Sequence, residues 1–211
     1  MINQRSPEWF EIRRGKFTAS EIHKLMGQKG MGKTGETYVM EKVVEELGAT
    51  MPPVSTYAME RGTELEPYAK AHYSKAFNCS VSPAEFIIAP WCDEAGASPD
   101  GIVTDWNQPA ESKLIEIKCP LNPVNHLQNF MVMSADDLKS LRPEYYWQIQ
   151  MQMAVCGFEV CDFVSYYPEI DEDFRMIAIT IKSNEADIDL MKTRISEAVE
   201  MKREMLKKIR L

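Results

Sequence analysis

Apolar residues recur every three or four positions in several stretches of the chain, the spacing of amphipathic helices. In the first stretch, Ile22, Leu25 and Met26 form the apolar stripe. Ser20 stands at its start, where a hydroxyl can cap free backbone N–H groups. Further helices are predicted over residues 39–47, 56–77, 123–133 and 143–156, and a last amphipathic helix follows Asn184.

Short apolar segments bounded by Pro, Gly, Asp or Asn predict strands. Three such segments span residues 85–89, 97–103 and 114–118, with a turn at 105–109 before the third. Two more span residues 163–167 and 176–181. Helices, three strands, helices, two strands and a last helix follow one another in this order. The order predicts an α/β fold with a mixed sheet.

Two segments interrupt this pattern without dividing the chain. Residues 27–35 hold four glycines and two lysines, which predicts a mobile basic loop, and Pro52-Pro53 breaks the chain before the helix at 56–77. No repeat or low-complexity tract occurs, and 211 residues suffice for one hydrophobic core. Residues 1–211 are therefore expected to form a single domain.

Composition bears on the compartment. No apolar run approaches the roughly 20 residues that span a membrane, and the N-terminus lacks the apolar core of a secretory signal. The five cysteines are odd in number and include no C-x-x-C pair. They fit reduced thiols better than a zinc or iron–sulfur site. We therefore expect a cytoplasmic protein.

Charge is distributed unevenly along the chain. The net charge of −8 argues against a passive coat for nucleic acid. Yet residues 1–35 hold seven basic and three acidic side chains, and residues 201–211 hold five basic and one acidic. The basic ends could hold phosphates while the acidic middle holds metal ions, or the terminal Lys and Arg could simply keep the chain soluble.

Three charged residues stand where apolar ones are expected. Glu116 and Lys118 alternate with apolar neighbours in the strand at 114–118, so both project to one face of the sheet. Burying two charges there is costly unless they pair or bind something. Asp100 lies 16 residues earlier, and a hairpin would bring it beside Glu116. A salt bridge on an edge strand is the alternative interpretation.

Two carboxylates and one ammonium suit the hydrolysis of a phosphodiester. Carboxylate oxygens are hard ligands that favour Mg²⁺ or Mn²⁺, and such ions polarise a phosphoryl group and activate water. Lys118 could accept a proton if its pKa were depressed, or it could stabilise the charge of the transition state.

Six ordered blocks of sequence resemble one family. Asp100 with Glu116 and Lys118 resembles the PD-(D/E)XK nuclease signature. The order and spacing of the blocks are similar to the lambda exonuclease (YqaJ-type viral recombinase) family over about residues 9–168. The blocks are residues 9–15, 18–21, 62–66, 98–101, 116–120 and 148–150. The resemblance implies a PD-(D/E)XK restriction-endonuclease-like core, in which a mixed central β-sheet is flanked by helices.

The resemblance also implies an activity and partners. It implies a magnesium-dependent exonuclease that enters linear duplex DNA at a 5′-phosphorylated end and degrades one strand 5′ to 3′. It further implies a ring-shaped homotrimer in a phage or prophage, which hands single strands to an annealing recombinase. Two metal ions would be held in each active site, with Mn²⁺ able to replace Mg²⁺.

The same resemblance assigns roles to particular residues. Asp100, Glu116 and Glu66 match metal ligands, with Ile117 counted among the metal-binding positions, and Lys118 matches the catalytic lysine. Glu66 is preferred over Glu64, because a helical spacing of two puts Glu64 on another face.

Glutamines and basic residues complete the expected site. Gln150 matches a glutamine near the attacking water, whereas its neighbour Gln152 is expected to face solvent or DNA. Arg13 and Ser20 match a pocket for the terminal 5′-phosphate, and a helix start with a nearby arginine would attract a phosphate in any case. Four basic residues are expected to contact DNA: Arg14, Lys16, Lys29 and Lys33.

Two other functions remain open. A structure-specific or restriction-type endonuclease could use the same fold, since fold does not fix substrate. The match of Arg13 and Ser20 favours an exonuclease, because only a strand end offers a terminal phosphate. A nuclease-dead DNA-binding protein is the third possibility, against which the complete set of charged residues argues.

Overall fold

The computed structural model describes residues 4–49, 56–105 and 112–210. Its centre is a five-stranded sheet with the strand order β2-β5-β6-β7-β8. Strands β6 and β7 are parallel, whereas the other neighbouring pairs are antiparallel. This mixed sheet confirms the predicted α/β class. The five strands are β2 (Cys79–Ser82), β5 (Gly101–Asp105), β6 (Lys113–Lys118), β7 (Val160–Tyr166) and β8 (Met176–Lys182).

A second, smaller sheet has the order β1-β4-β3. Strand β1 pairs with β4 in parallel, and β3 pairs with β4 antiparallel. The three strands are β1 (Phe17–Thr18), β4 (Cys92–Ala97) and β3 (Ile87–Ala89). Since β4 is followed closely by β5, this small sheet joins the N-terminal segment to the edge of the site described below.

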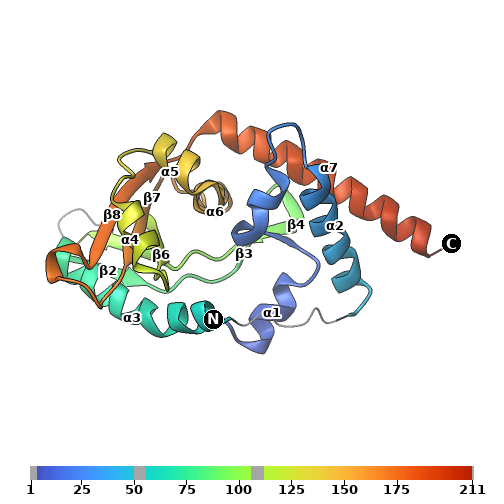
Figure 1. Cartoon of the computed structure of the whole chain (residues 1–211). Helices are drawn as coiled ribbons and strands as arrows, with labels where there is room; N and C mark the ends of the chain where they lie inside the picture. Colours follow the sequence, from blue (N-terminus) through green and yellow to red (C-terminus); the bar gives the residue numbers. More distant parts are fainter. Residues whose placement is uncertain (1–3, 50–55, 106–111, 211) are drawn as a thin grey trace.

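Helices surround both sheets. Figure 1 shows α6 end-on near the middle, α3 along one side of the central sheet, and α7 running past α6 and α2 to the C-terminus. The longer helices are α2 (Gly32–Glu46), α3 (Tyr57–Phe77), α6 (Pro143–Cys156) and α7 (Glu185–Ile209). The shorter ones are α1 (Pro7–Arg13), α4 (Pro123–Asn129), α5 (Ala135–Leu141) and the 3-10 helices η1 (Ala19–Leu25) and η2 (Glu172–Phe174).

Helix α6 lies at the centre of the main core. Most of its residues are buried, and it packs against η1, α5 and the small sheet. It begins with Pro143, whose missing N–H costs nothing in a first turn, and it ends at Gly157 in the left-handed conformation. Because α6 is buried on nearly every side, its polar side chains need hydrogen-bond partners inside the protein. Some of these partners belong to the pocket described below.

The two faces of the central sheet have different cores. Leu114 of β6 packs in the core around α6, whereas Ile115 and Ile117 pack in the core under α3. Because strand side chains alternate, Glu116 and Lys118 share the face of Leu114 and point toward α6.

The structure corrects several predicted boundaries. The strand predicted over residues 97–103 is two strands, β4 and β5, separated by residues 98–100. Helix α2 begins at Gly32, so the predicted loop over 27–35 is partly helical. Strands β1 and β2 were not predicted, because each is short and alternates weakly. Pro52, Pro53 and residues 106–109 of the predicted turn fall outside the described residues.

Within the described ranges, no helix has the length and apolar character needed to cross a membrane.

Candidate active site

Asp100 directly precedes β5, and hydrogen bonds to the neighbouring strand β6 fix its position. Its backbone N–H donates to Ile115 O at 3.2 Å, and its Oδ2 accepts from Ile117 N at 2.7 Å. A Cβ on the following residue, Gly101, would come within 2.8 Å of Ser82 O, so only glycine lets β2 approach this closely. The hairpin expected from the sequence therefore exists, and it fixes the Asp100 carboxylate beside β6.

Glu116 is the buried centre of a hydrogen-bonded cluster, and its side chain is almost inaccessible to solvent. Oε1 contacts Lys118 Nζ at 2.6 Å and accepts from Gln148 Nε2 at 2.7 Å. Oε2 accepts from Gln152 Nε2 at 2.6 Å. Lys118 Nζ also donates to Gln148 Oε1 at 3.1 Å. The ion pair considered from the sequence is present, but it lies inside a pocket rather than on an edge strand.

Glu66 reaches the same pocket from helix α3. Its Oε2 accepts from Arg5 at 2.8 Å, and its Oε1 accepts from Lys70 at 2.7 Å. Burial raises the pKa of Glu66, but the hydrogen bonds and charges of Lys70 and Arg5 outweigh it and lower the pKa overall. Glu64 is exposed and does not line the pocket, as the helical spacing predicts.

The three carboxylates act on one another through the pocket. Burial raises the pKa of Asp100 well above its usual value, and the nearby charges of Glu116 and Glu66 raise it further. Burial opposes the charge on Lys118, but Glu116 and Asp100 outweigh it and raise its pKa. In this arrangement Lys118 is an ammonium. Of its two expected roles, this favours the stabilisation of negative charge.

The donor set fits a hard divalent cation. Asp100, Glu116 and Glu66 offer carboxylate oxygens, the hard ligands that Mg²⁺ and Mn²⁺ prefer. As they stand, however, no three acidic, His or Cys side chains of the described residues are grouped closely enough to hold a metal ion. Arg5, Lys70 and Lys118 instead supply the cationic partners.

Arg13 and Ser20 form a second polar group in the same pocket. Arg13 Nη2 lies 3.4 Å from Ser20 Oγ, and the guanidinium stacks 3.9 Å from the centre of the Trp9 ring. Trp9 is itself held, because its Nε1 donates to Ser98 Oγ at 3.3 Å. Burial lowers the pKa of Arg13 to about 10, so it keeps its charge at neutral pH. A stacked cation beside a hydroxyl suits a phosphate.

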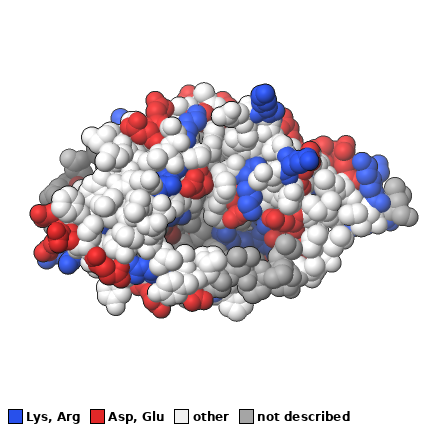
Figure 2. All heavy atoms as spheres, viewed as in Figure 1, with Lys and Arg blue, Asp and Glu red and all other residues white. Residues whose placement is uncertain are grey.

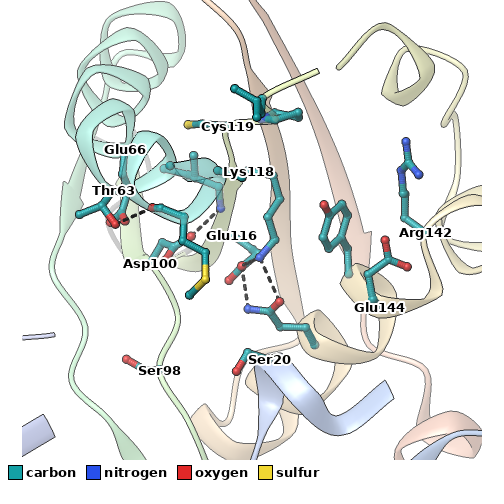
Figure 3. A pocket seen from close by; sticks show the side chains of 18 of the residues that line it. Ser20, Thr63, Glu66, Ser98, Asp100, Glu116, Lys118, Cys119, Arg142 and Glu144 are labelled. Atoms are coloured by element: carbon teal, nitrogen blue, oxygen red, sulfur yellow. Dashed lines mark hydrogen bonds and ion pairs between the residues drawn. The ribbon is translucent and has the colours of Figure 1, made fainter. Parts of the chain in front are cut away.

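One pocket of about 780 Å³ contains both groups. Figure 3 shows Glu66 and Asp100 on one side of Lys118, and Arg142 and Glu144 on the other. In Figure 2 this face of the molecule is hollowed near its middle, with basic and acidic atoms around the hollow. The pocket therefore brings together six of the expected residues: Arg13, Ser20, Glu66, Asp100, Glu116 and Lys118. Ile117, counted among the metal-binding positions, also lines it.

The expectation for Gln150 is wrong. Its Nε2 donates to Lys182 O at 3.0 Å and its Oε1 accepts from Asn184 N at 2.8 Å, so it ties α6 to the start of α7. Gln148, not Gln150, contacts Glu116. Gln148 and Gln152 are four residues apart and share a helix face, whereas Gln150 lies midway between them and points elsewhere. Gln152 was expected to face solvent or DNA, but it is fully buried against Glu116.

The other expected DNA contacts lie outside the pocket. Arg14 donates to Glu11 at 2.5 Å, and Lys16 is half-buried after α1. Lys29 and Lys33 are exposed before and within the first turn of α2. Sequence reasoning also missed Arg5 and Arg142, which line the pocket. No periodic pattern marks either one, because Arg5 precedes α1 and Arg142 stands between two helices.

Comparison with known proteins identifies the family. The central sheet holds carboxylates and Lys118 in one pocket, a set of groups that suits the hydrolysis of phosphodiesters. The family model of the YqaJ-like viral recombinase domain matches residues 8–159, and the chain belongs to this family. Among curated proteins, the comparison finds no match.

Solved structures agree with this assignment. The alkaline exonuclease LHK-Exo from Laribacter hongkongensis is 33% identical, with a TM-score of 0.83 and coverage of 97% of this chain and 96% of that chain. Its complex with dAMP matches equally well. A phage related exonuclease from Haemophilus somnus 129PT is 16% identical over 92% of this chain and 96% of that chain, with a TM-score of 0.75, and shows the fold alone. Together these matches support a recombination-related nuclease with a PD-(D/E)XK-like fold.

Proposed function

We propose that this protein is a magnesium-dependent exonuclease that degrades one strand of linear duplex DNA from its 5′ end. The observation that carries the proposal is the joint pocket. The carboxylates around Lys118 and the pair Arg13–Ser20 line the same cavity. A strand whose terminal phosphate rested on Arg13 would present a neighbouring phosphodiester to the acidic group.

Each residue of the pocket has a role in this proposal. Asp100, Glu116 and Glu66 would hold two metal ions. Ile117, which lines the same pocket, would be a further metal-binding position. Bound ions would polarise the phosphoryl group and lower the pKa of a water. The Lys118 ammonium would stabilise negative charge on the phosphoryl oxygens. Gln148 would fix the positions of the Glu116 and Lys118 side chains relative to each other, because it forms a hydrogen bond with both.

Arg13 and Ser20 would give the enzyme its preference for strand ends. An arginine fixed by stacking loses little freedom when it binds a phosphate, and Ser20 adds a hydroxyl donor. The known complex of LHK-Exo with dAMP supports a site for a nucleotide bearing one phosphate. An endonuclease would have no use for such a group, which is why the exonuclease is favoured.

The test compares duplexes with a 5′-phosphate and a 5′-hydroxyl. The wild-type protein is expected to degrade the phosphorylated duplex faster, and Arg13→Ala should reduce that preference. Arg194→Ala is the control, since Arg194 pairs with Glu197 at 2.8 Å and does not line the pocket. Equal rates on both duplexes, with Arg13→Ala no different from Arg194→Ala, would favour an endonuclease.

We also propose the biological setting. Residues 1–211 would act as a single nuclease domain in the cytoplasm of a bacterial host, as a phage or prophage protein. Three copies would form a ring around the duplex and pass the single strand to an annealing recombinase. Membership of a viral recombinase family supports this setting. Arg14, Lys16, Lys29 and Lys33 would then face the DNA, and light scattering of the purified protein tests the trimer.

A further inference from the structure

Arg142 stands at a fixed point of the pocket wall. It lies between α5 and α6, its N–H donates to Leu138 O at 2.8 Å, and its carbonyl accepts from Tyr145 N and Tyr146 N at 3.1 Å. Its side chain lines the pocket. In Figure 3 it lies on the opposite side of Lys118 from Asp100 and Glu66.

The partners of its guanidinium are neutral. Arg142 Nη2 donates to Gln128 Oε1 at 2.9 Å and lies 3.4 Å from Asn125 Oδ1. Amide oxygens orient a guanidinium without cancelling its charge. Arg5, another arginine of the pocket, pairs with Glu66. Among the described residues, none supplies a carboxylate partner to Arg142.

The helix that carries these two amides is itself anchored. Asn129 Nδ2 donates to Ser165 Oγ at 2.9 Å, and His126 Nδ1 lies 2.8 Å from the same hydroxyl. His126 Nε2 lies 2.7 Å from Phe174 O. These buried bonds fasten α4 to β7 and to the segment before β8, so Asn125 and Gln128 hold Arg142 from a fixed support.

A cation that amide oxygens orient and that forms no ion pair with the described residues, at the wall of a nuclease pocket, suits an anion of the substrate. The other such cation, Arg13, is assigned to the terminal phosphate, and the carboxylate group lies near Lys118. We propose that Arg142 is a second phosphate site, which binds an internal phosphate of the cleaved strand, distinct from both the terminal phosphate and the one that is hydrolysed. This proposal rests on the proposed function, because it concerns the same strand in the same pocket.

The consequence is a requirement for charge at one internucleotide linkage. A planar guanidinium makes charge-assisted hydrogen bonds to phosphate oxygens, and a neutral methylphosphonate at that linkage would lose them. Loss of such a contact should weaken binding about tenfold or more, given roughly 1.5–3 kcal/mol for a hydrogen bond to a charged group. Once Arg142 is removed, the same methylphosphonate should have no further effect.

The experiment uses short 5′-phosphorylated duplexes with one methylphosphonate at each of the first internucleotide linkages in turn. Binding is measured by fluorescence anisotropy in Ca²⁺, and cleavage is measured separately in Mg²⁺. The proteins are the wild type, Arg142→Ala and Arg142→Lys, with Arg210→Ala as the control because Arg210 is exposed and does not line this pocket. Thermal melting checks that each variant is folded.

We expect one linkage whose neutralisation weakens binding by the wild type and by Arg210→Ala, but not by Arg142→Ala. Arg142→Lys should retain part of the effect, since it keeps the charge and loses the planar fork. If the wild type shows no such linkage, or if Arg142→Ala responds to every linkage as the wild type does, the second phosphate site is overturned. Absence of cleavage of every duplex by the wild type would instead contradict the proposed function.

Discussion

The position of Gln148 provides a sharp prediction, because Gln150 is a matched control on the same helix. We consider Gln148→Met and Gln150→Met, two changes that keep side-chain length and remove the amide. Gln148 bonds to the Glu116 carboxylate at 2.7 Å and to the Lys118 ammonium at 3.1 Å. Gln150 bonds only to backbone groups of Lys182 and Asn184. Gln148→Met therefore disturbs the pocket, whereas Gln150→Met disturbs only the attachment of α6 to the start of α7.

The magnitudes follow from these partners. A hydrogen bond to a charged group contributes roughly 1.5–3 kcal/mol, so losing one such bond in the transition state slows cleavage about 10- to 150-fold. A neutral bond contributes roughly 0.5–1.5 kcal/mol, and Gln150→Met loses two of them in a buried setting. It should lower the free energy of unfolding by about 1–3 kcal/mol, or the melting temperature by roughly 2–12 °C, with little change in rate.

The assay pairs single-turnover cleavage of a 5′-labelled duplex with thermal melting of the same preparations. Gln148→Met should be slow and nearly as stable as the wild type, because water at the pocket can replace part of its bonding. Gln150→Met should cleave at a rate within about threefold of the wild type, since it leaves the pocket intact. A folded Gln150→Met without activity, beside an active Gln148→Met, would refute this assignment of the helix face.

Three further predictions concern charge. Asp100→Asn should lower the rate of cleavage at least about 100-fold. It should also reduce the rise in melting temperature that Mg²⁺ gives the wild type. An unchanged rise would show that Asp100 is not a metal ligand. Lys118→Ala should abolish turnover but spare DNA binding, and normal turnover of bound DNA would show that Lys118 is only a phosphate clamp. His126 is buried, and burial lowers its pKa, so stability is present above its unfolded pKa and declines as pH falls below about 6.5. His126→Gln should flatten that decline in urea titrations at pH 7 and pH 5, and an undiminished slope would contradict this.

Local rules predicted much of the site from the sequence. Strand alternation placed Glu116 and Lys118 on one face, and the expected hairpin placed Asp100 beside them. Helical spacing chose Glu66 over Glu64. The first and last of these inferences depend on residues within two positions of one another, where backbone geometry decides which way a side chain points, and the hairpin joins strands that are neighbours in the sequence.

The errors arose where tertiary structure decides. Gln148, Gln150 and Gln152 alternate in the sequence, and only the packing of α6 shows that the outer two face Glu116. Arg5 and Arg142 belong to no repeating pattern, and their places depend on how α1 and α5 join their neighbours. Strands β1 and β4 pair across more than 70 residues, a contact that no local pattern indicates.

The most direct test of the proposed activity compares linear duplex DNA with closed circular DNA of the same sequence, each incubated with the wild-type protein and Mg²⁺. The pocket that joins Arg13 and Ser20 to the carboxylates predicts release of 5′-mononucleotides from the two 5′ ends of the linear form, leaving single-stranded DNA, and no change in the closed circle. Conversion of the closed circle to nicked or linear DNA at a comparable rate would contradict the account, because cleavage would then not depend on a strand end.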